Sequence, residues 1–206
     1  MPTSTLSSAA VPGWFGKIPN LGDFASRRLP DEFIRAWDDW LQRGMTAARD
    51  ALGDAWSDVH LTAPIRRFWI GPGVLGGGGA CWAGLLMPSV DRVGRRFPLT
   101  MACASQGLAS VLAAHDWFRA LDGVARQALD EDCTVDELED ALAGISAVPD
   151  GEPAHELAGR LLRPFGGAAR CSVWWCDDAG PATKFLCVAA LPPAESFAAL
   201  LACGRC

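Results

Sequence analysis

Two apolar segments of strand length, separated by a short charged connection, constrain the fold of this chain most strongly. Residues 80–87 are apolar apart from glycine, and residues 97–103 are apolar apart from one threonine. The connection contains Gly94 and is flanked by prolines, which interrupt strands. It also carries Asp91 and three arginines. The pattern predicts a buried pair of antiparallel strands whose connecting loop displays a compact cationic group.

The rest of the chain alternates groups of helices with strand hairpins. Apolar residues at spacings of three and four predict an amphipathic helix over 31–52. Thr134 followed by Glu137 resembles a capping box that opens a further short helix. The other predicted elements are strands over 65–70, 170–176 and 184–190 and helices over 108–129 and 195–202. This order predicts an α+β fold, an α/β sandwich in which helices cover a mainly antiparallel sheet of about five strands.

Length and composition limit the class of protein. With 206 residues, half of them hydrophobic, the chain is long enough for one globular domain. We expect that domain over 13–202, with tails over 1–12 and 203–206. The net charge of −6 argues against nucleic-acid binding, which needs a concentrated basic face. The longest uncharged span, 68–90, contains seven glycines, so we expect no membrane insertion.

Candidate metal ligands and nucleophiles form no recognisable pattern. None of the three histidines stands in a metal-binding spacing. The one Cys-x-x-Cys pair, Cys203 with Cys206, lacks a second pair or a nearby histidine, so we expect no metal site. Cysteines inside apolar segments behave as small hydrophobic residues, and a Cys–His nucleophile would require proximity that only the fold can provide.

The glycine-rich run from Gly71 to Gly79 is the strongest nucleotide-binding signal in the sequence. Residues 71–76 fit G-x-G-x-x-G, and Asp91 lies twenty residues beyond Gly71, where a ribose-binding acid could stand. That fingerprint needs a helix to begin at the glycines, because the pyrophosphate sits at the helix N-terminus. Here an apolar strand follows, so the run predicts a hairpin connection instead.

Two charged stretches are candidate recognition sites. Arg92, Arg95 and Arg96 suit bidentate binding of a phosphate or carboxylate, or they form a solvated turn in which one arginine pairs with Asp91. Residues 130–140 hold seven acidic side chains. These form either a solvated helix face or a docking patch for a basic partner.

Several separate motifs follow one another along residues 13–190. In chain order, they are Gly13-Trp14-Phe15-Gly16-Lys17-Ile18-Pro19, Gly22-Asp23-Phe24, Trp37-Asp38-x-Trp40-Leu41, Trp69-x-Gly71, Gly84-x-Leu86-x-Pro88-Ser89-Val90-Asp91-Arg92-Val93-Gly94-Arg95, Phe97-Pro98-Leu99 and Trp174-Trp175. The longest contains Pro-Ser-x-Asp-Arg-x-Gly-Arg. Together these motifs resemble the TagF (ImpM) family.

The resemblance implies a regulatory protein and not an enzyme. Members of the family are cytoplasmic accessory factors of the type VI secretion system, which act after translation to repress its assembly by binding the forkhead-associated scaffold protein. The resemblance supplies no catalytic residue, cofactor or metal ligand. We expect the first motifs and the long motif to form one partner-binding surface. Its predicted residues are Lys17, Asp23, Arg27, Ser89, Asp91, Arg92 and Arg95.

An alternative function remains open on the sequence. In that alternative the chain is a nucleotide- or phosphate-binding enzyme domain, which uses the run from Gly71 to Gly79 and the loop from Arg92 to Arg96. The two functions differ in their ligands, because only the enzyme domain would bind nucleotides.

Overall fold

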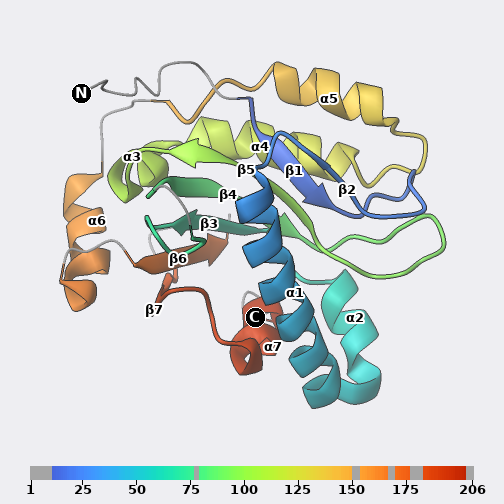
Figure 1. Ribbon diagram of the computed structural model, residues 1–206, viewed down its shortest axis with the longest axis horizontal. Coiled ribbons are helices and arrows are strands. Elements are labelled where there is room, and N and C mark those ends of the chain that lie inside the picture. Colours follow the sequence, from blue (N-terminus) through green and yellow to red (C-terminus); the bar gives the residue numbers. More distant parts are fainter. Residues whose placement is uncertain (1–10, 77–78, 150–153, 167–169, 177–182, 203–206) are drawn as a thin grey trace.

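An antiparallel sheet of seven strands runs through the described part of the protein (Figure 1). The computed structural model describes residues 11–76, 79–149, 154–166, 170–176 and 183–202. The strand order is β2-β1-β5-β4-β3-β6-β7. The strands are β1 (Gly13–Gly16), β2 (Ala25–Arg27), β3 (Arg66–Ile70), β4 (Cys81–Met87), β5 (Leu99–Ser105), β6 (Cys171–Cys176) and β7 (Leu186–Ala189).

Helices cover both faces of the sheet, so the fold is an α/β sandwich (Figure 1). Helices α1, α2 and α7 bury their apolar residues on one face, and α3 to α6 bury theirs on the other. The helices are α1 (Asp31–Leu52), α2 (Trp56–Leu61), α3 (Leu108–Ala113), α4 (His115–Gln127), α5 (Val135–Ala143), α6 (His155–Leu162) and α7 (Phe197–Ala202).

Aromatic rings fill the space between α1 and the sheet. The Trp37 side chain is fully buried, with its ring 4.9 Å from that of Phe68 and 5.9 Å from that of Trp174. Its indole N–H donates to Thr100 Oγ1 over 2.8 Å, so burial leaves no polar atom of this side chain unsatisfied. The tryptophans that set the helical period are therefore core residues.

On the sheet face that α3 to α6 cover, hydrogen bonds join the sheet to the acidic segment over 130–140. The buried Trp14 indole of β1 donates to Glu139 Oε1 of α5 over 2.7 Å. Arg28 forms an ion pair with the same carboxylate. Thr134 and Glu137 form the predicted capping box at the start of α5. Part of the acidic run thus stabilises the fold.

The structure confirms the predicted fold class and most of the predicted elements. Helix α1 spans the predicted residues 31–52, and the two hairpins pair in antiparallel register. The predicted count of about five strands is too low. Strands β1 and β2 have only four and three residues, too few for alternation of apolar and polar residues to be visible.

The helices differ from the predicted ones in three places. The predicted helix over 108–129 is two helices, because Ala114 adopts φ −82° and ψ 46° between α3 and α4. Helix α2, which contains His60, was not predicted, and neither was α6. With six and eight residues, each spans only about two helical turns.

Within the described residues, no helix is long and apolar enough to cross a bilayer. No group of three or more His, Cys, Asp or Glu side chains in that part of the chain could hold a metal ion. Residues 1–10 of the predicted N-terminal tail lie outside the described residues, as does the C-terminal tail over 203–206 with Cys203 and Cys206.

Candidate functional site

The turn over 17–24 and the loop over 88–97 lie side by side at one end of the sheet (Figure 1). The Arg92 backbone N–H donates to the Leu21 carbonyl over 3.0 Å. The Arg95 guanidinium donates to the Gly22 carbonyl over 2.6 Å. The expectation that the two motifs meet is confirmed.

A buried ion pair lies beneath this contact. Lys17 Nζ is 2.9 Å from Asp91 Oδ2, and the two side chains are 7% and 0% exposed. The ring of Phe24 covers the ammonium group, with its centroid 4.8 Å from Nζ. The pair therefore links the turn to the loop from below and is shielded from water.

Asp91 also determines the shape of the loop. Its Oδ1 accepts hydrogen bonds from the backbone N–H groups of Val93 and Arg95, over 3.0 and 2.9 Å. Its Oδ2 accepts from Arg95 Nε over 2.6 Å. Gly94 supplies the left-handed backbone conformation at φ +79° that closes the turn.

These hydrogen bonds keep Asp91 ionised. Burial raises the pKa of a carboxyl group, but donors from Lys17, Arg95 and Val93 favour the charged form more strongly. The pKa of Asp91 consequently lies well below its usual value. The carboxylate is a permanent acceptor at physiological pH.

Ser89 and His60 fix the base of the loop. Ser89 Oγ donates to the Lys17 carbonyl over 2.6 Å, and His60 Nε2 donates to the Ser89 carbonyl over 3.2 Å. Burial lowers the pKa of His60; the bond to Ser89 raises it and the charge of Arg96 lowers it further, so the net shift is downward. The ring is therefore neutral at pH 7, and its proton lies on Nε2.

The predicted site residues fall into two groups. Lys17, Ser89 and Asp91 are buried, whereas Asp23, Arg27, Arg92 and Arg95 are exposed. The buried residues hold the loop in position, and only the exposed ones are open to a partner.

Two of the basic residues point elsewhere. Arg27 lies on the edge strand β2 and donates to the Ser26 carbonyl. Within the described structure, no hydrogen bond or ion pair joins Arg27 to the 88–97 loop. Arg96, the third loop arginine, is half-buried and donates to Ser57. The cationic group that the loop exposes therefore consists of Arg92 and Arg95, and not of all three arginines as predicted.

Exposed apolar side chains lie among the charges. Val93 is 68% exposed, Phe24 46% and Leu129 37%, and they are three of the five large hydrophobic residues that are exposed in the described part of the chain. Sequence reasoning missed them, although the position of Val93 between charged residues in a predicted loop was a usable signal.

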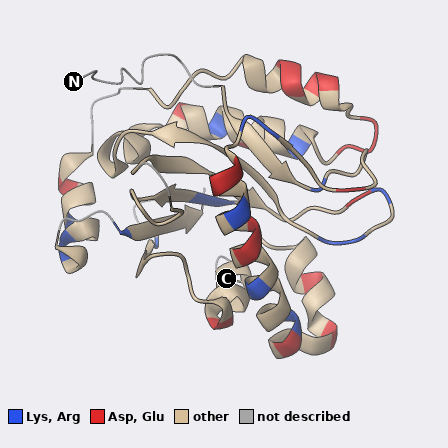
Figure 2. Ribbon diagram, in the orientation of Figure 1, with Lys and Arg blue, Asp and Glu red and all other residues tan. Residues whose placement is uncertain are grey.

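The turn that follows α4 completes this face. Asn20 Nδ2 donates to the Glu131 carbonyl over 3.3 Å, which joins the 129–132 turn to the 17–24 turn. A hollow of about 560 Å³ lies between the 129–132 turn and the 88–97 loop. Figure 2 shows the basic and acidic loops beside each other at this end. We call the exposed group the loop surface: Asp23, Phe24, Arg92, Val93, Arg95, Leu129, Glu131 and Asp132.

The glycine run forms a different structure from a dinucleotide-binding turn. It connects β3 to β4, which pair antiparallel with Ile70 opposite Trp82. No helix begins in the described part of this connection, and Gly77 and Gly78 lie outside the described residues. The hairpin prediction is confirmed, and the helix N-terminus that would receive a pyrophosphate is not formed at residues 71–76.

Cys81 of β4 and Cys103 of β5 are poor nucleophiles. Burial raises the pKa of Cys103 to about 11, and it also raises the pKa of Cys81. Both thiols are therefore protonated at pH 7, whereas the thiolate is the reactive form.

Comparison with known proteins agrees with the fold and the motifs. A family model described as "TagF N-terminal domain, Type VI secretion system-associated" matches residues 13–145. The crystal structure of PA0076 from Pseudomonas aeruginosa PAO1 is similar, with 35% sequence identity and a TM-score of 0.79. The match covers 92% of this chain and 93% of that chain. No curated protein matches the chain.

Proposed function

This chain belongs to the TagF family of proteins associated with the type VI secretion system, and on that premise we propose that it represses assembly of the secretion machine by binding the forkhead-associated scaffold protein. In this proposal the protein acts after translation, in the cytoplasm, and transforms no substrate. The loop surface makes the contact.

The observation that carries the proposal is the set of exposed apolar residues among opposite charges. Protein interfaces have apolar centres surrounded by polar rims, and a few buried anchors supply most of the binding energy. Val93 and Phe24 are suited to be such anchors, because they are the most exposed apolar residues of the loop surface. Arg92 and Arg95 on one side and Glu131 on the other would set the orientation of the partner.

The network under the loop surface supports the same proposal. A loop that is ordered before binding loses less conformational entropy in the complex. Asp91 orders the loop through Lys17, Arg95 and the Val93 backbone. The exposed side chains are therefore presented by a loop of fixed shape.

The alternative of a phosphate-binding enzyme domain has weaker support. Arg92 lines the hollow of the loop surface, but the exposed acidic residues Glu131 and Asp132 line it as well. Two acidic residues beside one guanidinium oppose the binding of a phosphate.

The test is a binding and secretion experiment on the full-length protein. Arg92→Ala with Arg95→Ala removes two exposed charges of the loop surface, and we expect loss of scaffold capture in a pull-down and release of secretion in cells. Arg95 also donates to the buried Asp91 carboxylate and to the Gly22 carbonyl, so we expect the thermal unfolding midpoint to fall by several degrees while Lys17 still holds Asp91. Circular dichroism verifies that the variant is folded at the temperature of the pull-down. A thermal-shift screen with nucleotides and phosphate tests the alternative on the same protein.

A matched control makes the same change in net charge. Arg43→Ala with Arg119→Ala also removes two arginines, each exposed and paired with a neighbouring aspartate on its own helix. We expect this variant to capture the scaffold and repress secretion normally. Unfolding of the first variant would show that its arginines are structural, and stabilisation by a nucleotide without scaffold capture would favour the enzyme.

A further inference from the structure

A second candidate site lies at the other end of the molecule from the loop surface (Figure 1). It is a cleft of about 670 Å³ between α3, α6 and the β6–β7 hairpin. Small-molecule sites in proteins have volumes of roughly 300–1,000 Å³ and are mostly apolar with a few polar groups. The lining residues are Leu112, Ala113, His115, Ala154, Leu157, Arg160, Leu161, Trp175, Thr183 and Phe185.

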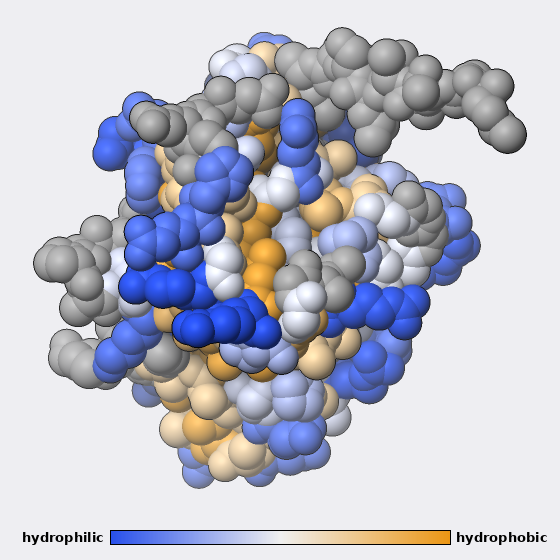
Figure 3. All heavy atoms as spheres, turned by 90° about the vertical axis from the view of Figure 1, so that its left-hand side faces the viewer, coloured by the Kyte–Doolittle hydropathy of each residue, from blue (hydrophilic) through white to orange (hydrophobic). Residues whose placement is uncertain are grey.

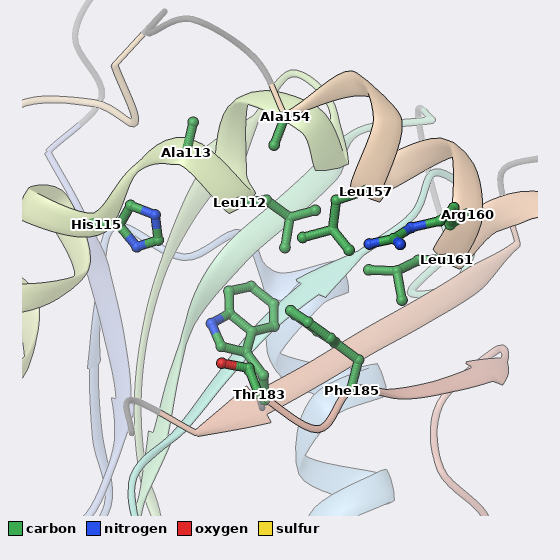
Figure 4. Close-up of a pocket in the computed structure, with 10 residues that line it drawn as sticks. Leu112, Ala113, His115, Ala154, Leu157, Arg160, Leu161, Thr183 and Phe185 are labelled. Carbon is green, nitrogen blue, oxygen red and sulfur yellow. The ribbon is translucent and has the colours of Figure 1, made fainter. Parts of the chain in front are cut away.

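The body of the cleft is apolar. Figure 4 shows Phe185 on one side, opposite the leucines of α3 and α6. Trp175 of β6 also lines the cleft. The rings of Trp175 and Phe185 are 6.0 Å apart between centroids. These side chains offer an aliphatic or aromatic ligand a surface on two sides, from which water would be released on binding.

The polar groups of the cleft favour an anion. Among the described residues that line it, Arg160 alone has a permanent charge, and none is acidic. In Figure 4 the Arg160 guanidinium projects from α6 toward the space between Leu157 and Leu161. In the described part of the chain, no ion pair holds this guanidinium in place. Asp116, which follows the lining residue His115, is paired with Arg119 at 2.7 Å.

Hydrophobic residues are also exposed on the side of the molecule where the cleft lies. Figure 3 looks at the side of the molecule that carries α6, and it shows a strip of hydrophobic residues between strongly hydrophilic ones. An apolar depression with a cationic group at its edge matches a ligand that has an apolar body and an anionic head.

We propose that this cleft binds a small amphipathic carboxylate, with a medium-length hydrocarbon body against Trp175, Phe185 and Leu157 and its head group paired with Arg160. An arginine binds a carboxylate through two parallel hydrogen bonds. The proposal does not depend on the loop surface, so the two can fail separately.

Calorimetric titration of the full-length protein with decanoate, below the concentration at which decanoate forms micelles, tests this proposal. Decanol and decyltrimethylammonium are the neutral and cationic comparisons. We expect decanoate to bind at one site, decanol to bind at least tenfold more weakly, and the cation not to bind. Absence of decanoate binding, or equal binding of the cation, would overturn the proposal.

Variants assign the binding to the cleft. Arg160→Ala is expected to weaken decanoate at least tenfold while leaving decanol within twofold, because only the head group loses its partner. Arg163→Ala, an exposed arginine that does not line the cleft, is the matched control and is expected to bind decanoate normally. Equal decanoate affinity in Arg160→Ala and the wild type would contradict the assignment.

A change inside the cleft separates ligand binding from self-association. Leu157→Glu is expected to abolish binding of both decanoate and decanol without a change in mass by light scattering, and circular dichroism verifies its fold. A lower mass in this variant, together with absence of decanoate binding to the wild type, would identify the cleft as an interface between copies and overturn the proposal. Should this variant unfold, Leu161→Gln replaces it with the same expected result.

Discussion

The loop surface and the cleft beside α6 differ in what lies beneath them. Under the loop surface a lysine and an aspartate are paired out of contact with water. Under the cleft lies the apolar core that Leu112 and Trp175 share with the sheet. The first surface consequently has its shape fixed by directional bonds, whereas the second depends on non-directional packing.

This difference indicates how each surface can bind. A polar network that is satisfied in one geometry specifies that geometry, and it costs stability when one member is removed. An apolar cleft tolerates small changes in its occupant and in its walls. The loop surface is therefore suited to one protein partner, and the cleft to a class of similar small molecules.

The largest effect is expected from breaking the buried pair. Lys17→Met removes the buried cation that pairs with the Asp91 carboxylate and leaves only the exposed guanidinium of Arg95 beside it. Loss of one partner from a buried ion pair is strongly destabilising. We expect the lowest urea midpoint of all the variants considered. Asp91→Asn added to Lys17→Met removes that charge and should recover part of the loss. A double variant less stable than Lys17→Met would show that the charge of Asp91 is not the cause.

A smaller loss of stability is expected from a substitution that strains the backbone of the 88–97 loop but leaves the Lys17–Asp91 pair intact. Gly94 has φ +79°, and apart from its chain neighbours no atom lies within 4 Å of the position that an alanine Cβ would take. Gly94→Ala therefore costs only backbone strain, about 1–2 kcal/mol of unfolding free energy. Gly123→Ala in α4, where space is also free, is the control and should be neutral or stabilising. Equal urea midpoints for the two variants would mean that the loop relaxes.

A still smaller loss of stability is expected from a substitution in the wall of the cleft. Leu157 is half-buried, so Leu157→Ala should cost about 1 kcal/mol or less, because part of its area already meets water. Chemical denaturation measures this cost. A loss as large as that of Lys17→Met would show that the cleft wall supports the fold as strongly as the buried pair does.

The smallest effect is expected from pH, and it acts through His60 at the base of the 88–97 loop. The pKa of His60 is lower in the folded protein than its usual 6.5, so below that pH the unfolded state binds more protons and stability falls. The contribution is fully present above pH 6.5 and is lost as the pH drops. His60→Gln keeps an N–H donor but does not titrate. It should therefore show a smaller decrease in urea midpoint between about pH 7.5 and 5.5, and an unchanged decrease would contradict this.

Local sequence patterns predicted the longer elements. Helix α1 shows a helical period over its 22 residues, and β4 and β5 lie in continuous apolar segments of strand length. Strand β2, with three residues, and the break at Ala114 depend on tertiary contacts and backbone angles that a period does not encode.

The two sites were predictable to different extents. The motifs that hold Lys17 and Asp91 pointed to one surface, but not to the burial of the pair, because charged residues are usually exposed. The cleft combines residues from 112 to 185 that belong to separate elements. Nothing in their local spacing brings them together, so only the fold revealed it.

The dissociation constant of the purified protein with the forkhead-associated scaffold protein shows whether the loop surface binds that scaffold. We expect Arg92→Ala with Arg95→Ala to raise this constant at least tenfold and Arg43→Ala with Arg119→Ala to leave it within twofold. Equal constants for both double variants and the wild type would contradict the claim that the loop surface binds the scaffold.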